Sequence, residues 1–208
     1  MNELHGCQLC PRLAAHRIEQ KSRFPDYLCL PVAGFGAADA RLLIVGLAPG
    51  LHGANATGRP FTGDASGQVL FETLYKYGFA SQPASQRGDD NMRLVDCRIT
   101  NAVKCLPPQN RPSGAEIRQC NPYLRDEITQ LNPGSVILAL GAIAHRSVLR
   151  ALDLPQCAMQ FKHLGEHQLP AELSLIDSYH CSRYNFNTGR LNQKMFEQVF
   201  RNIAGLMA

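Results

Sequence analysis

The chain has 208 residues, of which 45% are apolar and 18% charged, with a formal net charge of +4. This size and composition are typical of a globular domain with a substantial core, which excludes a disordered protein. No apolar run reaches the length of a membrane span and no secretory signal is recognisable, so we expect a cytoplasmic protein without a membrane partner. The modest positive charge permits a polyanionic partner.

The first feature in chain order is a pair of cysteines, Cys7 and Cys10. Eight cysteines are many for a cytosolic chain, in which disulfides are rare. Cys105 and Cys120 follow in mid-chain, so that four thiolates could hold one structural zinc ion or one iron–sulfur cluster. The spacing alone does not separate zinc from iron. The remaining four are expected to be small buried hydrophobes: Cys29, Cys97, Cys157 and Cys181.

A buried strand is predicted over residues 41–47, and it leads through a glycine-rich loop into a helix over residues 66–77. In open α/β sheets, ligands bind where the strands end. The loop therefore predicts a binding site for something flat and polar, because it offers polar groups and one aromatic face: His52, Asn55, Arg59, Phe61 and Asp64. Asp64 stands just before the helix, where aspartate is also a favoured N-cap.

The rest of the chain repeats this alternation of strand and helix. Further strands are predicted at residues 95–103, 135–140 and 173–177, with helices from the capping box at Ser113, over residues 142–152 and over residues 189–206. Alternating strands and helices favour a parallel sheet with right-handed crossovers. We therefore predict one three-layer α/β/α domain over residues 1–208, with a central four-stranded parallel sheet.

The residues around the cysteines and the loop carry a resemblance to a known family. Asn101-Ala102-Val103-Lys104-Cys105-Leu106-Pro107-Pro108 resembles the mid-chain signature of the iron–sulfur uracil-DNA glycosylases. The loop Gly46-Leu47-Ala48-Pro49-Gly50, with Gly58-Arg59-Pro60-Phe61 after it, resembles their first motif, and His180-Cys181-Ser182 resembles their second. The loop is most similar to family 5, or type B; the sister family 4 has a glutamate where this chain has Leu47.

The resemblance implies a DNA glycosylase. We expect it to be monofunctional, because no lysine lies within the loop to form a Schiff base, and to act as a monomer. It would hydrolyse the N-glycosidic bond of uracil and of other deaminated bases in DNA, and so start base excision repair. It also implies a [4Fe–4S] cluster on the four cysteines named above: Cys7, Cys10, Cys105 and Cys120. The alternative is an inactive or redox-type iron–sulfur DNA-binding protein, because Leu47 leaves the family 4 carboxylate position vacant.

Site roles follow from the same resemblance. Residues expected to hold the base are Gly46, Ala48, Phe61, Asn101 and His180. Residues expected to be catalytic are His180, Asp64 and Asn55, with His52 a weaker candidate; we expect His180 to contribute more than any loop carboxylate. Residues expected to contact DNA are Arg59, Lys104, Arg111, Arg183 and Arg190, with Tyr184 as a wedge. Each has an ordinary alternative, such as a core ring for Phe61 or a solvated surface charge for an arginine.

Overall fold

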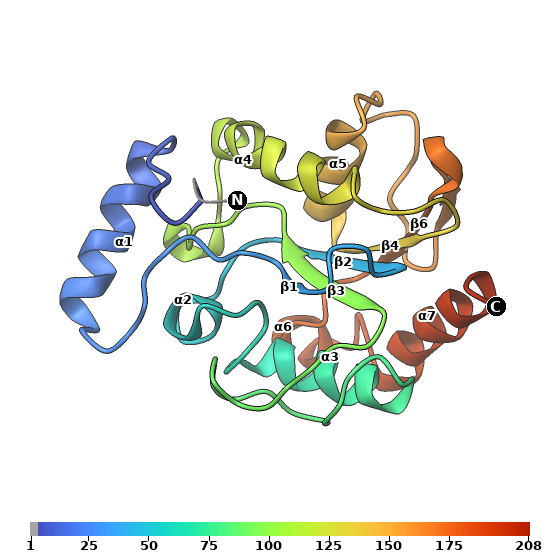
Figure 1. Cartoon of the computed structure of the whole chain (residues 1–208), viewed down its shortest axis with the longest axis horizontal. Helices are drawn as coiled ribbons and strands as arrows, with labels where there is room; N and C mark the ends of the chain where they lie inside the picture. Colours follow the sequence, from blue (N-terminus) through green and yellow to red (C-terminus); the bar gives the residue numbers. More distant parts are fainter. Residues whose placement is uncertain (1–3) are drawn as a thin grey trace.

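The computed structural model describes residues 4–208; residues 1–3, the start of the segment in which no secretory signal was expected, lie outside the described residues. The chain folds around a six-stranded sheet with strand order β1-β3-β2-β4-β6-β5 (Figure 1). The four central strands are parallel and the two edge strands antiparallel to their neighbours. The strands are β1 (Phe35–Gly36), β2 (Leu42–Gly46), β3 (Cys97–Asn101), β4 (Val136–Leu140), β5 (Glu166–Gln168) and β6 (Ser174–Ser178).

Alternating side chains of the sheet supply two apolar cores, because successive residues of a strand point to opposite faces. In β2, Leu42 and Ile44 pack with helices α3 and α7, while Leu43 and Val45 pack with α4 and α5. Figure 1 shows these helix pairs on opposite faces of the sheet. The helices are α1 (Pro11–Arg23), α2 (Ala54–Thr57), α3 (Ala65–Lys76), α4 (Gly114–Ile128), α5 (Ala142–Ala151), α6 (Arg183–Asn187) and α7 (Gln193–Leu206).

The three-layer α/β/α fold and its four parallel strands are confirmed, and the edge strands β1 and β5 are additions to the prediction. The unpredicted helix α1 buries Leu13, Arg17 and Gln20, so its inward face is mostly polar and gives no apolar periodicity to read. Among the described residues, no helix is both long and apolar enough to cross a membrane.

A buried charge network fixes β6, the strand that leads to His180. His145 of α5 is 1% exposed; its Nδ1 lies 2.8 Å from Asp177 Oδ1, and its Nε2 lies 3.0 Å from the Met159 carbonyl. A carboxylate and a carbonyl only accept hydrogen bonds, so both ring nitrogens of His145 carry a proton. Burial alone would lower the pKa of His145, but the hydrogen bond to Asp177 and its charge outweigh burial, and the pKa is raised.

His145→Gln is expected to lower the free energy of unfolding by about 3 kcal/mol, the lower end for a broken buried ion pair, because His167 still faces Asp177. The raised pKa also sets the sign of a pH effect. The stabilisation from His145 is complete below the pKa of an unfolded histidine and is lost as the pH rises through the raised, folded-state value. Urea unfolding of both proteins from pH 6 to pH 9 should show their difference shrinking with pH; a constant difference would contradict the assignment.

Candidate active site

The carboxyl ends of β2, β3 and β6 meet at one edge of the sheet, where a cavity of about 570 Å³ opens. β2 pairs with β3 on one side and with β4 on the other, so the chain reverses direction through the sheet at this point, which is where ligands bind in α/β folds. The wall of this cavity includes five of the predicted site residues: Ala48, Phe61, Asp64, Asn101 and His180.

The Phe61 ring forms one side of the cavity and faces His180, with ring centroids 5.9 Å apart and planes at 22°. Its backbone has φ of 58°, a left-handed conformation that is uncommon for a phenylalanine and typical of constrained functional loops. Two glycines make room for it. A Cβ on Gly67 would lie 1.6 Å from the Phe61 carbonyl oxygen, and a Cβ on Gly46 would lie 2.8 Å from the Phe61 ring. Gly46 therefore backs the cavity and does not line it.

Asn101, the last residue of β3, presents its amide to the same space. The side chain is 3% exposed, and its Oδ1 has no hydrogen-bond partner among the residues that the structure describes. A Cβ on Gly46 would lie 2.4 Å from this oxygen, so the oxygen sits beside the end of β2. A buried acceptor without a partner is unfavourable by itself. It is suited to a ligand that carries an N–H group.

Asp64 caps a helix and also reaches the cavity. Its Oδ1 accepts a hydrogen bond of 2.8 Å from the Gly67 N–H and caps α3. Its Oδ2 points the other way, toward the cavity loop, because it would lie 2.5 Å from a Cβ on Gly53 and 3.2 Å from one on Gly50. One carboxylate oxygen thus fixes the group, and the other is available for chemistry.

His180 lies opposite, in the loop that follows β6. Burial lowers the pKa of His180, and the charge of Asp64 offsets only part of that effect, so the ring is neutral at pH 7. The Asn185 side chain donates a hydrogen bond of 2.8 Å to the His180 carbonyl, and Ser182 caps α6 just beyond. A neutral, fixed imidazole can donate one hydrogen bond to a developing anion.

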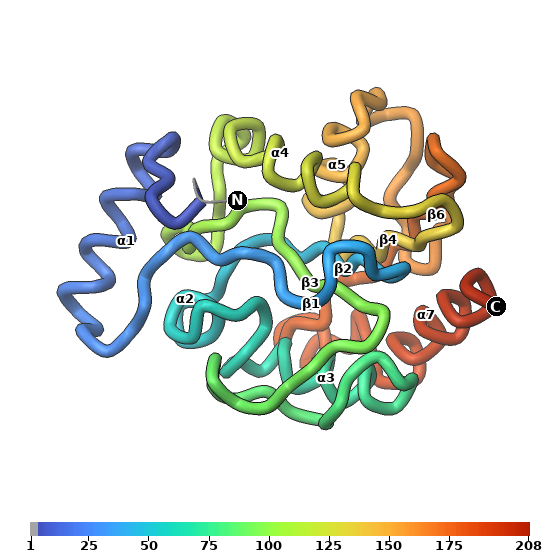
Figure 2. The backbone as a smooth tube through the Cα atoms, in the orientation of Figure 1, coloured from blue at the N-terminus to red at the C-terminus, as the bar shows by residue number. Residues whose placement is uncertain are grey.

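Asn55 does not line the cavity, so the structure does not bring it together with the other predicted catalytic residues. It is 1% exposed, and its Nδ2 lies 3.4 Å from the Cys29 sulfur. The backbone carbonyl of Asn55 accepts a hydrogen bond from the Cys29 N–H, in the segment that returns from α1 to the sheet past α2 (Figure 2). Asn55 therefore holds two loops together. His52 does line the cavity, and its Nδ1 lies 2.9 Å from the Tyr27 hydroxyl.

Two of the predicted DNA contacts have charged groups that are already engaged within the protein. The Arg59 guanidinium pairs with Asp90 and lies over the Phe35 ring, 4.4 Å from its centroid, with the side chain 12% exposed. The Lys104 side chain is 1% exposed, and its ammonium lies 2.6 Å from a Glu127 oxygen. Neither can reach a phosphate without breaking these contacts.

The other predicted DNA contacts are on the surface beside the cavity. Arg183 lines the cavity mouth at the start of α6 and is exposed. Arg190 is exposed with its guanidinium 4.5 Å from the centroid of the Tyr179 ring. Tyr184 is 71% exposed between them. Arg111 is also exposed. These positions leave all four side chains available to a large ligand over the cavity.

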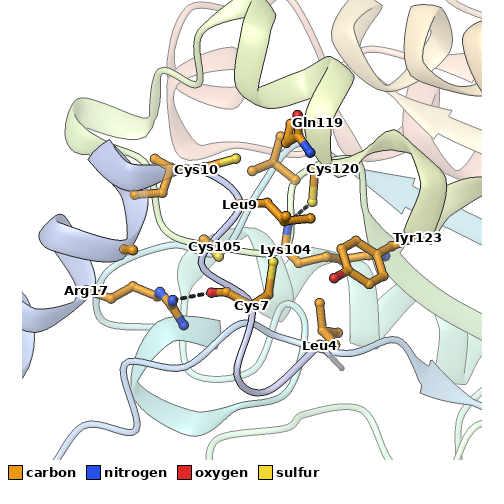
Figure 3. Close-up of a pocket in the computed structure, with 13 residues that line it drawn as sticks. Leu4, Cys7, Leu9, Cys10, Arg17, Lys104, Cys105, Gln119, Cys120 and Tyr123 are labelled. Atoms are coloured by element: carbon orange, nitrogen blue, oxygen red, sulfur yellow. Dashed lines mark hydrogen bonds between the residues drawn. The ribbon is translucent and has the colours of Figure 1, made fainter. Parts of the chain in front are cut away.

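The four predicted metal-binding cysteines surround a separate hollow (Figure 3). Cys7 and Cys10 precede α1, Cys105 follows β3, and Cys120 belongs to α4. Burial raises the pKa of Cys105 to about 12 and that of Cys120 to about 11, with the other thiols adding to both shifts. A cation among the sulfurs would reverse this, because metal coordination deprotonates a thiol.

Four cysteine thiolates are a donor set that suits either a tetrahedral zinc ion or an iron–sulfur cluster. Zn–S bonds of about 2.3 Å in a tetrahedron hold the sulfurs about 3.8 Å apart. Within residues 4–208, these cysteines are not among the groups of three or more side chains that lie close enough to share one metal ion. A cluster with one iron on each thiolate is wider than a single ion and suits such a ring. The Lys104 N–H also lies 3.2 Å from the Cys120 sulfur, as is favourable for a thiolate.

Sequence reasoning missed three polar residues that line the cavity: Ser66, Asn110 and Ser182. Ser182 carried a signal, since it precedes a short helix as an N-cap. Asn110 lies in a turn with φ of 56° after the two prolines, and nothing in its own neighbourhood indicates that the turn folds back over the cavity.

Comparison with known proteins agrees with this arrangement. The model of the uracil DNA glycosylase superfamily matches residues 33–204. A type-5 uracil-DNA glycosylase of Thermus thermophilus is 44% identical over 98% of this chain and 96% of its own length. A type-5 enzyme of Mycobacterium leprae is 40% identical over 96% of this chain and 91% of its own. A type-4 uracil-DNA glycosylase of Pyrobaculum aerophilum is 39% identical over 72% of this chain and 62% of its own.

Proposed function

The chain belongs to the uracil-DNA glycosylase superfamily, and we propose that it is a type-5 enzyme that excises uracil, and other deaminated bases such as hypoxanthine, from DNA. The observation that carries the proposal is the cavity at the sheet edge, where Phe61, Asn101 and His180 converge from three separate segments. We further propose that the chain acts as one domain and as a monomer, since all of these residues come from a single chain.

The geometry supports a division of labour on a flipped base, which an enzyme must draw out of the duplex before it can act. Phe61 packs against the flat face of the base. The unpartnered Oδ1 of Asn101 accepts a hydrogen bond from the N3–H of uracil, and its Nδ2 can donate to O4. His180 donates to O2, where negative charge develops as the glycosidic bond breaks.

Water attack on the sugar is assigned to Asp64. Its Oδ2 faces the cavity while its Oδ1 stays in the helix cap, so the carboxylate can hold a water without giving up the cap. Leu47 offers no polar group for this task. No lysine lines the cavity in the part of the chain that the structure describes, which supports hydrolysis without a Schiff base.

We also propose that Cys7, Cys10, Cys105 and Cys120 hold a [4Fe–4S] cluster. Bound there, the cluster would supply four iron–thiolate bonds that cross-link the chain before α1, the end of β3 and α4. The ion pair between Arg12 and Glu116, with N···O of 2.6 Å, already ties α1 to the capped start of α4. Arg12 and Glu116 thus hold the segment with Cys7 and Cys10 close to the helix that carries Cys120.

Asp64→Asn separates the cap from the chemistry. Asparagine caps a helix about as well as aspartate, so the melting temperature should stay near that of the wild type. Loss of the carboxylate should slow uracil excision by about 10²-fold, the lower end for a general base. Single-turnover kinetics and thermal melting check both results. Near-wild-type activity would restrict Asp64 to the cap.

The proposal is tested on duplexes that carry one uracil, one hypoxanthine or one mismatched thymine. After incubation with pure protein, alkali cleaves the strand wherever a base has been removed. Strong cleavage at uracil, weaker cleavage at hypoxanthine and none at thymine is the expected pattern. Iron-replete protein that binds the uracil duplex but yields no cleavage would favour the non-catalytic DNA-binding alternative.

A further inference from the structure

A third hollow, of about 160 Å³, lies on the outer surface between α4 and α5, which pack side by side (Figure 1). Three arginines line it: Arg118 of α4 and Arg146 and Arg150 of α5. The other lining residues carry no charge: Gly114, Ile117, Ile143, Ser147 and Gln156. Positive charge is therefore concentrated in one place that has no carboxylate on its wall.

The three guanidinium groups make no hydrogen bond or ion pair with any residue that the structure describes. By contrast, Arg125 of the same helix α4 pairs with Asp153 at 2.6 Å. The Nε of Arg150 is buried without a partner, and a buried donor normally has one. Arg118 bends back over the first turn of α4, since its Nη1 would lie 3.6 Å from a Cβ on Gly114. The positive end of that helix adds to the attraction for an anion.

The hollow has a neighbour that reaches toward the active-site edge of the sheet. Arg146 and Gln156 also line a neighbouring hollow of about 560 Å³, whose wall includes Ala142 and Phe161. Ala142 follows Gly141 directly, and a Cβ on Gly141 would lie 3.8 Å from the His180 Cβ. The two hollows share Arg146 and Gln156 and are together called the arginine groove here. Its end at Ala142 lies one residue from Gly141, beside His180.

We propose that the arginine groove binds the phosphodiester backbone of the DNA strand beyond the flipped nucleotide. Guanidinium groups bind phosphate through paired hydrogen bonds. A strand that leaves the base cavity past His180 meets Arg146 along the groove. The inference rests on the proposed function for the identity of its ligand, and it adds contacts that hold DNA without reading its sequence.

The test is the salt dependence of binding to an undamaged duplex, measured by fluorescence anisotropy over a series of KCl concentrations. Each lost phosphate contact should reduce the slope of log K against log[KCl] by about 1. The triple variant Arg118→Gln, Arg146→Gln, Arg150→Gln should therefore show a shallower slope than the wild type. Arg146→Gln alone, which changes one exposed side chain, should lose about 1 and serves if the triple variant does not fold. An unchanged slope in both variants would overturn the proposal.

Arg93→Gln is the matched control, because Arg93 is exposed and lies before the start of β3, at the opposite edge of the sheet. The slope for Arg93→Gln should equal that of the wild type. If Arg93→Gln lowers the slope as much as Arg146→Gln does, the effect comes from net charge alone and the proposal is overturned. Duplexes shortened on one side of a uracil give a second readout. Shortening on the groove side should weaken the wild type and leave the triple variant unaffected.

Failure of the groove and failure of the proposed function give different results. Normal uracil release by the wild type, with unchanged slopes in the variants, would overturn the groove proposal and leave the proposed function in place. If the wild type releases no uracil but the variants still show a shallower slope, the proposed glycosylase activity is wrong and the groove is still a DNA-binding surface. Polyglutamate serves as an acidic-protein probe: if the variants lose its binding but keep the full DNA slope, the groove binds protein and the proposal is wrong.

Discussion

His180→Ala is expected to reduce the single-turnover rate of uracil excision by about 10²–10³-fold, the usual loss when one donor to a developing anion is removed. The reason lies in the cavity: His180 is neutral because burial lowers its pKa, and it stands across from Phe61 at the base site. Binding to undamaged duplex DNA should hardly change, because an unflipped base does not reach His180. A rate within tenfold of the wild type would contradict the assignment.

His52→Ala is the matched variant, since His52 is the second histidine on the cavity wall and is held by the Tyr27 hydroxyl. We expect His52→Ala to lower the rate by less than about tenfold, because His52 is not assigned a hydrogen bond to the departing base. A larger loss in His52→Ala than in His180→Ala would reverse the two roles. The pH–rate profile adds a check. The lowered pKa of His180 keeps the ring neutral, so the rate should not fall between pH 8 and the ordinary histidine value of about 6.5.

Cys120→Ala is expected to abolish iron binding and to lower the melting temperature by about 10 °C or more, because the cross-link between α1, β3 and α4 loses one of its thiolates. The wild type should be brown and contain about four irons per chain. Iron analysis, visible absorbance and thermal melting of anaerobically purified protein measure these effects. Full iron content in Cys120→Ala would mean that Cys120 is not a ligand. One zinc per chain in the wild type would mean that the four cysteines hold a zinc ion and not a cluster.

Cys97→Ala is the control for the loss of a buried thiol. Cys97 is fully buried in the sheet, in the core against α3 and α7, and lies apart from the four-cysteine hollow. Cys97→Ala removes the same atoms as Cys120→Ala, so the packing defect should lower the stability of the protein modestly. It should retain all of its iron. Equal iron loss in both variants would mean that the cluster responds to stability in general and not to one ligand.

The core of the fold could be predicted because the sequence pattern of each central element is strong. The apolar run that becomes β2 and the capping box at Ser113 and Glu116 are local signals with local causes. The edge strand β5 was not predictable, because its three residues are polar and gain their order from pairing with β6. The helix α1 was missed because it buries Arg17 against the Cys7 carbonyl and not an apolar stripe.

The candidate site divides in the same way. Residues at strand ends, such as Asn101 and His180, could be placed from topology alone, because parallel strands bring their carboxyl ends to one edge. Arg59 and Lys104 could not, because their partners Asp90 and Glu127 are distant in sequence, and the sequence shows a charge but not its pairing. Asn55 looked catalytic by its position in the loop, and only the packing of Cys29 against it shows a structural role.

We propose that the cavity formed by Phe61, Asn101 and His180 hydrolyses the bond between uracil and deoxyribose. Mass spectrometry of the products from a duplex with one uracil opposite guanine tests it most directly. One free uracil per duplex and an otherwise unbroken strand with an abasic site are expected. A strand cut without alkali, or no free uracil from folded protein that holds its iron, would contradict it.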